Sequence, residues 1–510
     1  MKKPTKLFLM LFLGCIIHSY SQISKEEIII SKIRNEGFNN SEVMARLSHL
    51  TDVYGQRLTG TREYYAAAKW ISSEMKNIGL ENVHFENYCS DCRGWNLKSF
   101  NMEMISPNYM HISAYPLAMS KSTNGIISGQ VVSIENYQDM NLVKNEFSGK
   151  LKGKIILLGS EPKKKSLLDT ITFRFSKRDL DKKETQLSAE KKQTPLPELF
   201  KKWEIEDKSD DAILQFLEAE GALAIMTTRP MYLGVLHPDG TYYYRNDDIK
   251  PLPYFTIMPE HFGRLFRLLK LNITPTIRLN LDTEFYLEPE NNVNIIGEIP
   301  GNDAQLKSES ILIGAHFDSW HSGTGATDNG VNCTVLVEAL RILKTIGYSP
   351  KRTIKIGLWG GEEQAFLGSA AYASQHFGQL DEKPNAESTK VSAYLNLDNG
   401  AGAIRGIYLQ NNEFARPVFD NIFSFIPNIT DGAVTIENTL STDHETFDYY
   451  NIPAFQFIQD VMEYRTVTHH TILDVLEYVN ENDIKKNAVI LAWTIYSLSE
   501  MKEKVPRKQK

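Results

Sequence analysis

The chain has 510 residues, which is too long for one compact hydrophobic core and therefore predicts at least two domains. Hydrophobic residues make up 42% of the sequence and charged residues 23%, as in an ordinary soluble globular protein. The formal net charge of -7 is spread thinly over this length, and it argues against nucleic acid as the main partner.

Residues 1–21 are typical of a secretory signal peptide. A basic start is followed by an apolar run from Leu7 to Ile17, and a small residue, Ser21, stands at the expected cleavage site. The apolar run is short for a membrane span, and no transmembrane segment is expected later in the chain. A lipoprotein signal is the lesser alternative, because Gly14 precedes Cys15. The protein is therefore expected to be secreted or periplasmic, either free or anchored through Cys15.

Residues 22–125 are expected to form the first part of the main domain. An amphipathic helix is predicted from Thr59 to Leu80, and a strand follows from Val83 to Tyr88. The pair Cys89 and Cys92 has two interpretations, a local disulfide or half of a zinc site. The disulfide is favoured, because an exported protein permits it and the sequence offers no second cysteine pair.

The pattern changes between residues 126 and 285, where short strand-like runs are separated by turns. These runs lie at residues 128–135, 151–161, 221–228, 252–258 and 275–286. Between them, the segment from Lys163 to Trp203 is rich in charge and poor in apolar periodicity, which predicts an exposed and mobile insertion. We expect an inserted β-rich domain over residues 126–285.

Residues 286–510 alternate between strand-like and helix-like runs. The predicted strands lie at residues 311–316, 353–359, 392–398 and 453–458, and the predicted helices at residues 332–346, 365–377, 415–425 and 481–501. This alternation predicts an α/β fold, with a mostly parallel central sheet flanked by helices. Ligands of such sheets bind beyond the carboxyl ends of the strands, so functional residues are expected there.

The predicted strand ends and the loops near them carry side chains that bind divalent metals. In chain order they are His316, Asp318, Asp328, Glu362, Glu363, Asp398, His469, His470 and Asp474. Imidazole and carboxylate ligands suit zinc, and one shared carboxylate would let five side chains hold two ions. Any one of these residues alone would more often be a cap or a loop residue. Their occurrence at several strand ends of one sheet favours a metal site.

The motifs around these residues resemble those of the co-catalytic dizinc aminopeptidases and carboxypeptidases, the zinc exopeptidases. The similar stretches are "GAHFDSWHSGTGATDNG", "LWGGEEQAFLGS", "LNLDN", "STDHETF" and "HHTILD". Within this family the chain most resembles the carboxypeptidase Q branch. The resemblance implies a secreted exopeptidase that hydrolyses dipeptides or terminal residues of short peptides. It also implies that the inserted domain is a protease-associated domain, which shapes the cleft or contributes to a homodimer.

The resemblance implies two Zn²⁺ ions per chain and assigns five ligands to them. One ion would be held by His316, Asp328 and Asp398, and Asp328 would bridge to a second ion held by Glu363 and His470. His470 is preferred to His469, because the family pattern has three residues between the ligand and the following aspartate.

The resemblance also assigns roles to residues that do not bind metal. Glu362 would be the general base, which passes a proton from water to the leaving amine. Asp318 would orient the first imidazole ligand, and Asp474 would be an outer partner of His470. His444 would either donate a hydrogen bond to the substrate or its oxyanion, or be a structural residue that caps a loop.

The sequence leaves the recognised peptide terminus open. Arg405 and Arg465 could pair with a C-terminal carboxylate, but no spacing selects them, so aminopeptidase activity is not separated from dipeptidase or carboxypeptidase activity.

Two other functions compete with the exopeptidase prediction. A single-zinc enzyme similar to glutaminyl cyclases would share the fold, but those enzymes lack the inserted domain. A non-catalytic binding protein on this scaffold would have lost ligands, whereas all five and Glu362 are present.

Overall fold

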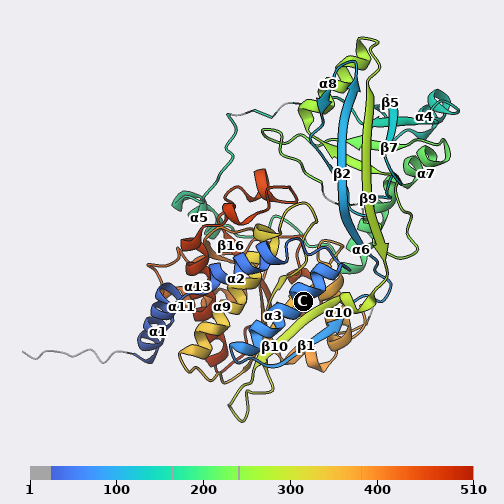
Figure 1. The fold of residues 1–510 in the computed structure, drawn as a ribbon. Helices are drawn as coiled ribbons and strands as arrows, with labels where there is room; N and C mark the ends of the chain where they lie inside the picture. Colours follow the sequence, from blue (N-terminus) through green and yellow to red (C-terminus); the bar gives the residue numbers. More distant parts are fainter. Residues whose placement is uncertain are drawn as a thin grey trace, which may run out of the picture.

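The computed structural model describes residues 24–508 except residues 164, 167, 239, 241 and 381, so the predicted signal peptide and Cys15 lie outside the described residues. Two eight-stranded sheets organise the chain, one in the main body and one in a second lobe (Figure 1). The predicted α/β class is confirmed. No helix in the described part combines the length and the apolar character needed to cross a membrane.

The first sheet has the strand order β1-β10-β12-β11-β13-β16-β14-β15. Its four central strands, β12, β11, β13 and β16, run parallel, which confirms the predicted parallel core. Antiparallel pairs on both sides, such as β10 with β12 and β14 with β16, extend it. The strands are β1 (Glu81–Asn87), β10 (Val293–Ile299), β11 (Ser310–His316), β12 (Thr353–Trp359), β13 (Val391–Asn396), β14 (Ile404–Tyr408), β15 (Ala433–Thr435) and β16 (Ala454–Gln459).

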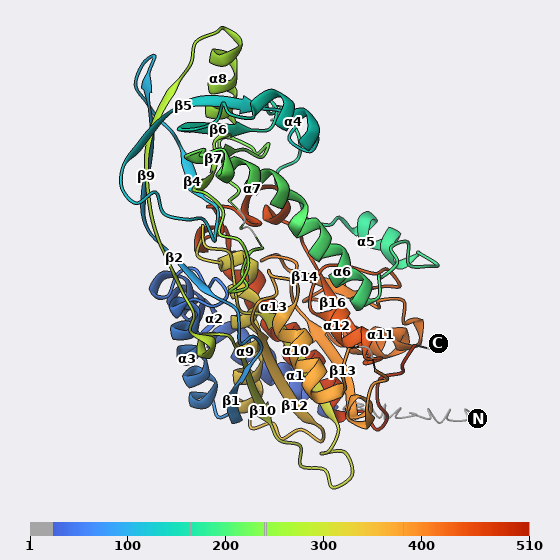
Figure 2. The same ribbon diagram turned by 90° about the vertical axis from the view of Figure 1, so that its right-hand side faces the viewer.

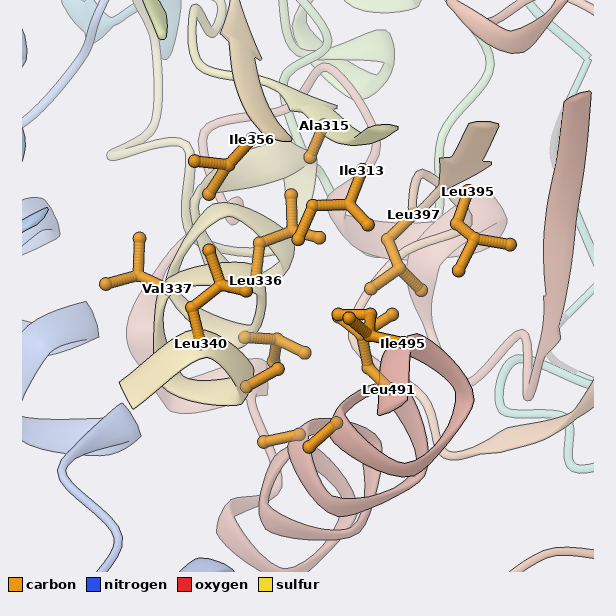
Figure 3. Close-up of a cluster of buried hydrophobic side chains, with 14 of the residues drawn as sticks. Ile313, Ala315, Leu336, Val337, Leu340, Ile356, Leu395, Leu397, Leu491 and Ile495 are labelled. Carbon is orange, nitrogen blue, oxygen red and sulfur yellow. The ribbon is translucent and has the colours of Figure 1, made fainter. Parts of the chain in front are cut away.

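Helices cover both faces of this sheet, because its buried strands carry apolar side chains on both sides. Ile313 and Ala315 of β11 pack against helices α9 and α13 (Figure 3), whereas Leu312 lies in the apolar cluster on the opposite face. The helices on the first face are α1 (Lys25–Asn39), α2 (Val43–Ser48), α3 (Arg62–Asn77), α9 (Val331–Thr345), α11 (Arg416–Ser424) and α13 (Glu481–Glu500). The helices on the second face are α10 (Leu367–Phe377) and α12 (His444–Tyr449).

The second sheet has the order β3-β2-β9-β5-β6-β7-β8-β4, and it begins before the predicted boundary at residue 126. Its strands are β2 (Gly94–Ser106), β3 (Met110–His111), β4 (Ala114–Pro116), β5 (Ile127–Ile134), β6 (Lys154–Leu158), β7 (Ala224–Thr227), β8 (Tyr254–Ile257) and β9 (Thr276–Tyr286). Strand β2 pairs antiparallel with β9 along most of its length. The domain boundary itself stays a prediction, because an alternating pattern identifies a strand without showing which sheet it joins.

Three helices pack with the second sheet, so the lobe is less purely β-rich than expected: α4 (Met140–Phe147), α7 (Asp211–Ala219) and α8 (Pro259–Lys270). The long strands β2 and β9 lead from the main body into this lobe (Figures 1 and 2). Near the start of β2 the structure joins Cys89 and Cys92 in a disulfide, which confirms the favoured interpretation of this pair.

The charged segment is largely exposed, as predicted, but several contacts fasten it to the main body. We call residues 171–203 the strap; it contains α5 (Lys177–Glu184) and the first part of α6 (Leu196–Asp207). Arg174 pairs with Asp460 at 2.9 Å and with Asp483 at 2.6 Å, and the backbone of Phe173 pairs with that of Met462. Most residues of the segment are exposed and many are charged. Its few anchoring residues therefore produce no apolar periodicity that the sequence could show. Figure 2 shows α6 between the two lobes.

Candidate metal centre

The five predicted zinc ligands lie together beyond the carboxyl ends of the parallel strands. His316 is the last residue of β11, and Asp398 follows β13 by two residues. The ligands form two groups that share Asp328: His316, Asp328 and Asp398, and Asp328, Glu363 and His470. In each group, one ligand atom from every residue lies within 4.8 Å of the others.

The distances within both groups fit a bound ion. His316 Nε2 lies 3.2 Å from Asp328 Oδ1 and 3.3 Å from Asp398 Oδ1. His470 Nε2 lies 3.4 Å from Asp328 Oδ2 and 3.0 Å from Glu363 Oε2. A tetrahedral zinc ion with bonds of about 2.0–2.1 Å separates its ligand atoms by about 3.3 Å. The two oxygens of Asp328 face different groups, as a bridging carboxylate requires.

The electrostatics of the cluster also favour a cation. Burial, reinforced by neighbouring carboxylates, raises the pKa of Glu362 and of Glu363 well above the usual range of a glutamate. Burial acts to lower the pKa of His316, but Asp398 and Glu362 raise it well above its usual value. Asp328 Oδ2 and Glu363 Oε1 are buried and have no hydrogen-bond partner among the described residues. A divalent ion would relieve this crowding of negative charge and satisfy both oxygens.

Asp318 holds the two adjacent glutamates. Its carboxylate accepts the backbone N–H of Glu362 at 3.1 Å and that of Glu363 at 3.2 Å. His316 Nδ1 lies 3.1 Å from the backbone carbonyl oxygen of Asp318, but 3.6 Å from its carboxylate. A separation of 3.6 Å is too long for a hydrogen bond. Asp318 therefore orients the imidazole through its backbone, and its carboxylate fixes the loop that carries Glu362 and Glu363.

Asp474 supports the bridging ligand. Its Oδ1 accepts hydrogen bonds from the backbone N–H of Thr327 at 2.6 Å and from the hydroxyl of Thr327 at 2.8 Å. Thr327 directly precedes Asp328, so these two bonds fix the loop at the bridging residue. The expected support of His470 by Asp474 stays a prediction.

Glu362 belongs to neither ligand group and lies at a cavity of about 630 Å³. Both lobes line this cavity: Glu362, Glu363 and Phe366 come from the main body, and Trp203, Arg229, His237 and Tyr243 come from the inserted part of the chain. The ring of Trp203 meets that of Phe366 edge to face at a centroid distance of 5.0 Å. The inserted part therefore forms walls of the cavity that reaches the two glutamates.

His444 hydrogen-bonds within its own loop. The side chain is completely buried, and its Nε2 lies 3.1 Å from the carbonyl oxygen of Thr439. Burial lowers the pKa of His444 to about 3. Burial raises the pKa of the neighbouring Asp443 to about 7, and the charges of His316 and Asp398 also act on this carboxyl. This arrangement favours the structural interpretation of His444 over the substrate-binding one.

The sequence did not single out Tyr464, which the structure places at the bridging ligand. Burial raises the pKa of its phenol well above the usual value, and the nearby charges of Asp328 and Asp398 raise it further. Its ring lies 5.0 Å from that of His469, which in turn stacks on His470 at 3.7 Å. A Cβ at Gly400 would come within 2.6 Å of the Tyr464 ring. A tyrosine in an irregular loop carries no spacing signal, so only the fold reveals this contact.

The two candidate arginines differ in their surroundings. Arg405 pairs with Asp431 at 2.6 Å and with Asp460 at 2.7 Å, and it also donates to the backbone of the strap. These bonds give Arg405 a structural role and leave it poorly placed to pair with a substrate carboxylate. Arg465 lines a second cavity of about 330 Å³ between the strap and the loop that carries Tyr464. Of the two, Arg465 is the one placed beside open space.

Comparison with known proteins gives one consistent result. The model of peptidase family M28 matches residues 294–494. Carboxypeptidase Q of Mus musculus is 22% identical over 495 residues, which cover 96% of this chain and 92% of that protein. Carboxypeptidase Q of Homo sapiens is 23% identical over 466 residues, which cover 91% of this chain and 86% of that protein.

Solved structures share the fold across almost the whole chain. A peptidase M28 precursor from Shewanella amazonensis SB2B superposes with a TM-score of 0.68 at 22% identity, covering 95% of this chain and 99% of that one. BSAP, a zinc aminopeptidase from Bacillus subtilis, superposes with a TM-score of 0.56 at 19% identity, covering 91% of this chain and 96% of that one. Both lobes are therefore part of the shared architecture.

Proposed function

We propose that this chain, a metallo-exopeptidase similar to the proteins of peptidase family M28, hydrolyses dipeptides or the terminal residues of short peptides at a pair of zinc ions. The observation that carries the proposal is the presence of two ligand groups that share Asp328. A single group would serve one ion, whereas a shared carboxylate is what two neighbouring ions require.

In this proposal each ligand group holds one zinc ion. His316, Asp328 and Asp398 bind the first, and Asp328, Glu363 and His470 bind the second. Zinc at these positions supplies Lewis acidity, which polarises the peptide carbonyl and acidifies a water molecule. Asp318 and Asp474 hold the backbone on either side of the centre, so the ligands need little rearrangement to bind.

Glu362 acts as the general base in this proposal. It takes the proton of the attacking water and delivers it to the amine that leaves. Three observations support the role: Glu362 lies at the cavity, it is outside both ligand groups, and Asp318 anchors its backbone. Tyr464, whose phenol is close enough to Asp328 to respond to its charge, would donate a hydrogen bond to the oxyanion of the tetrahedral intermediate.

The larger cavity is the proposed substrate site. The inserted lobe, interpreted as a protease-associated domain, closes one side of it through Trp203 and Tyr243, which limits the length of peptide that reaches Glu362.

We further propose that the protein is exported by the signal peptide at residues 1–21 and acts outside the cytoplasm. A homodimer, expected from the family resemblance, belongs to the same proposal.

A peptide panel on purified, zinc-loaded protein tests the function. It contains dipeptides and longer peptides, each with free, N-blocked or C-blocked termini, and it compares wild type with Glu362→Gln. Hydrolysis of short peptides with one free terminus by wild type alone is the expected result. The proposal is wrong if wild type cleaves none of them, or if Glu362→Gln is equally active.

Zinc stoichiometry separates the competing functions. Two ions per fully loaded chain are expected. One ion per chain, together with cyclisation of N-terminal glutamine, would replace the exopeptidase by the glutaminyl cyclase-like alternative. If the protein binds peptides but hydrolyses none of them, the non-catalytic binding protein would be the supported alternative.

A further inference from the structure

Arg57 is a buried arginine that hydrogen-bonds to the loop between two proposed zinc ligands, His316 and Asp328. It lies in the N-terminal part of the chain, outside the residues matched by the family model, and is completely buried. Its Nε donates to the carbonyl oxygen of Phe317 at 2.7 Å, directly after His316. Its Nη1 and Nη2 donate to the carbonyl oxygens of Thr324 at 2.9 Å and Gly325 at 2.8 Å. One guanidinium thus binds both ends of the loop from His316 to Asp328.

The backbone of Arg57 binds the same loop. Its N–H donates to the hydroxyl of Ser319 at 3.0 Å, and its carbonyl oxygen accepts the N–H of Ser319 at 3.1 Å. The side chain also donates to the carbonyl of Gly55 at 3.1 Å, which holds the guanidinium against its own segment. The loop is therefore fixed at its start, near its middle and at its end by a single residue.

The contact leaves little room for movement. Gly325 has a φ of 63°, and a Cβ there would lie 2.4 Å from Cβ of Ser319 and 2.7 Å from Nη2 of Arg57. A Cβ at Gly330 would lie 3.1 Å from the same nitrogen. The planar guanidinium donates hydrogen bonds to several carbonyl oxygens at fixed positions. A lysine ammonium cannot reproduce this geometry.

The charge of Arg57 also matches its surroundings. Its bonds go to neutral carbonyls, and burial lowers its pKa, but the carboxylates of Asp474 and Asp318 favour its charged form. These two carboxylates are the ones that hold Thr327 and the glutamate pair. Arg57 thus supplies buried positive charge beside the residues that orient the metal centre.

We propose that Arg57 is a positioning residue that presets the loop between His316 and Asp328 for binding two metal ions. The inference rests on the proposed dizinc function. When Arg57 is lost, the loop has to be ordered by the metal itself, so zinc binding weakens and turnover falls. Substrate binding depends on the cavity walls and changes little. Residues that orient metal ligands from outside the ligand set typically contribute about 10- to 100-fold to metal affinity.

The test measures zinc affinity and kinetics on the full-length protein carrying Arg57→Lys or Arg57→Ala. Competition with a chromophoric chelator should show zinc affinity lowered about 10- to 100-fold. At saturating zinc, kcat should fall while KM stays within about twofold of wild type. Millimolar guanidinium chloride should restore part of the zinc affinity of Arg57→Ala, because the ion can fill the vacated site.

Arg352→Lys is the matched control. Arg352 is equally buried and donates to the carbonyl of Lys502 at 3.0 Å and to Glu309 at 2.7 Å, away from the metal loop. It should lower thermal stability without changing zinc affinity. If Arg57→Lys does not fold, Ser319→Ala removes one anchor more gently and should still weaken zinc binding severalfold.

Two results would overturn the inference. One is wild-type zinc affinity in folded Arg57 and Ser319 variants, and the other is an equal loss of affinity in Arg352→Lys. Zinc affinity is measured without substrate, so failure of the proposed peptidase function would appear separately, as an inactive wild type that still binds zinc through a preset loop.

Discussion

The two sheets each contain parallel strands that end towards one cavity, but they contribute different chemistry. Beyond the ends of β11, β12 and β13 in the first sheet lie imidazoles and carboxylates, including His316 and Glu362. The end of β7 in the second sheet brings Thr227, Thr228 and Arg229 to the cavity. Similar architecture therefore carries no function by itself, and in the proposed function the side chains at the strand ends divide catalysis from recognition.

Substitution of Glu362 gives the largest expected difference between the two regions. Glu362→Gln should lower kcat by about 10²–10⁴-fold, because it removes the proton carrier and keeps the shape of the side chain. Glu206→Gln is the matched control, since Glu206 lines the same cavity from α6. Steady-state kinetics on one dipeptide measures both variants. Equal losses in both would mean that catalysis and recognition are not divided between the sheets.

Tyr464→Phe should give the next largest effect. Removing the phenolic hydroxyl near Asp328 takes away the proposed hydrogen-bond donor to the oxyanion, which predicts a fall in kcat of about 10- to 100-fold with zinc retained. Tyr243→Phe is the control, because the hydroxyl of Tyr243 donates to Asp211 in the second lobe. An unchanged kcat in Tyr464→Phe would assign this tyrosine to packing alone.

Arg229→Gln probes the recognition side. Loss of a cation from the wall supplied by the second sheet should raise KM about 3- to 10-fold for peptides with a free carboxylate and leave kcat unchanged. The corresponding change in α8, Arg264→Gln, removes a cation outside this cavity and should leave both constants as they are. A fall in kcat without a change in KM would contradict the proposed division.

Arg174→Ala should have the smallest effect on catalysis. It removes the pairs with Asp460 and Asp483, but Arg405 still pairs with Asp460. Because Arg174 is partly exposed, the free energy of unfolding should fall by only about 1 kcal/mol. Trypsin should cut the strap faster than in wild type. Arg178→Ala, an exposed change in the same strap, is the control, and equal cutting in both variants would exclude anchoring by Arg174.

The parts of the fold that follow a regular period were predictable from the sequence. The helix at Val331–Thr345 and the strands ending at His316 and Trp359 follow apolar patterns, and the structure places them as predicted. The pairing of Gly94–Ser106 with Thr276–Tyr286 in the second sheet was not predicted, since pairing partners leave no mark on a single strand. The strap was predicted to be mobile, because a few anchors such as Arg174 do not alter a charged composition.

The candidate site was predictable where residue type and strand position coincide. His316, Asp328, Glu363, Asp398 and His470 come together in two groups, as the motifs indicated. The contacts of Asp474 and His444 depend on local loop geometry, and the sequence could not show that they go to Thr327 and Thr439. The hydrogen bonds from Arg57 to the loop after His316 join residues more than two hundred positions apart in the sequence, so they are visible only in the folded chain.

The central claim is that two adjacent glutamates do different work at a two-zinc centre. Metal analysis of zinc-loaded wild type, Glu362→Gln and Glu363→Gln tests it most directly. The account predicts two zinc ions per chain in wild type and in Glu362→Gln, and fewer than two in Glu363→Gln, with both variants inactive. Equal zinc loss in the two variants, or a single ion in wild type, would contradict it.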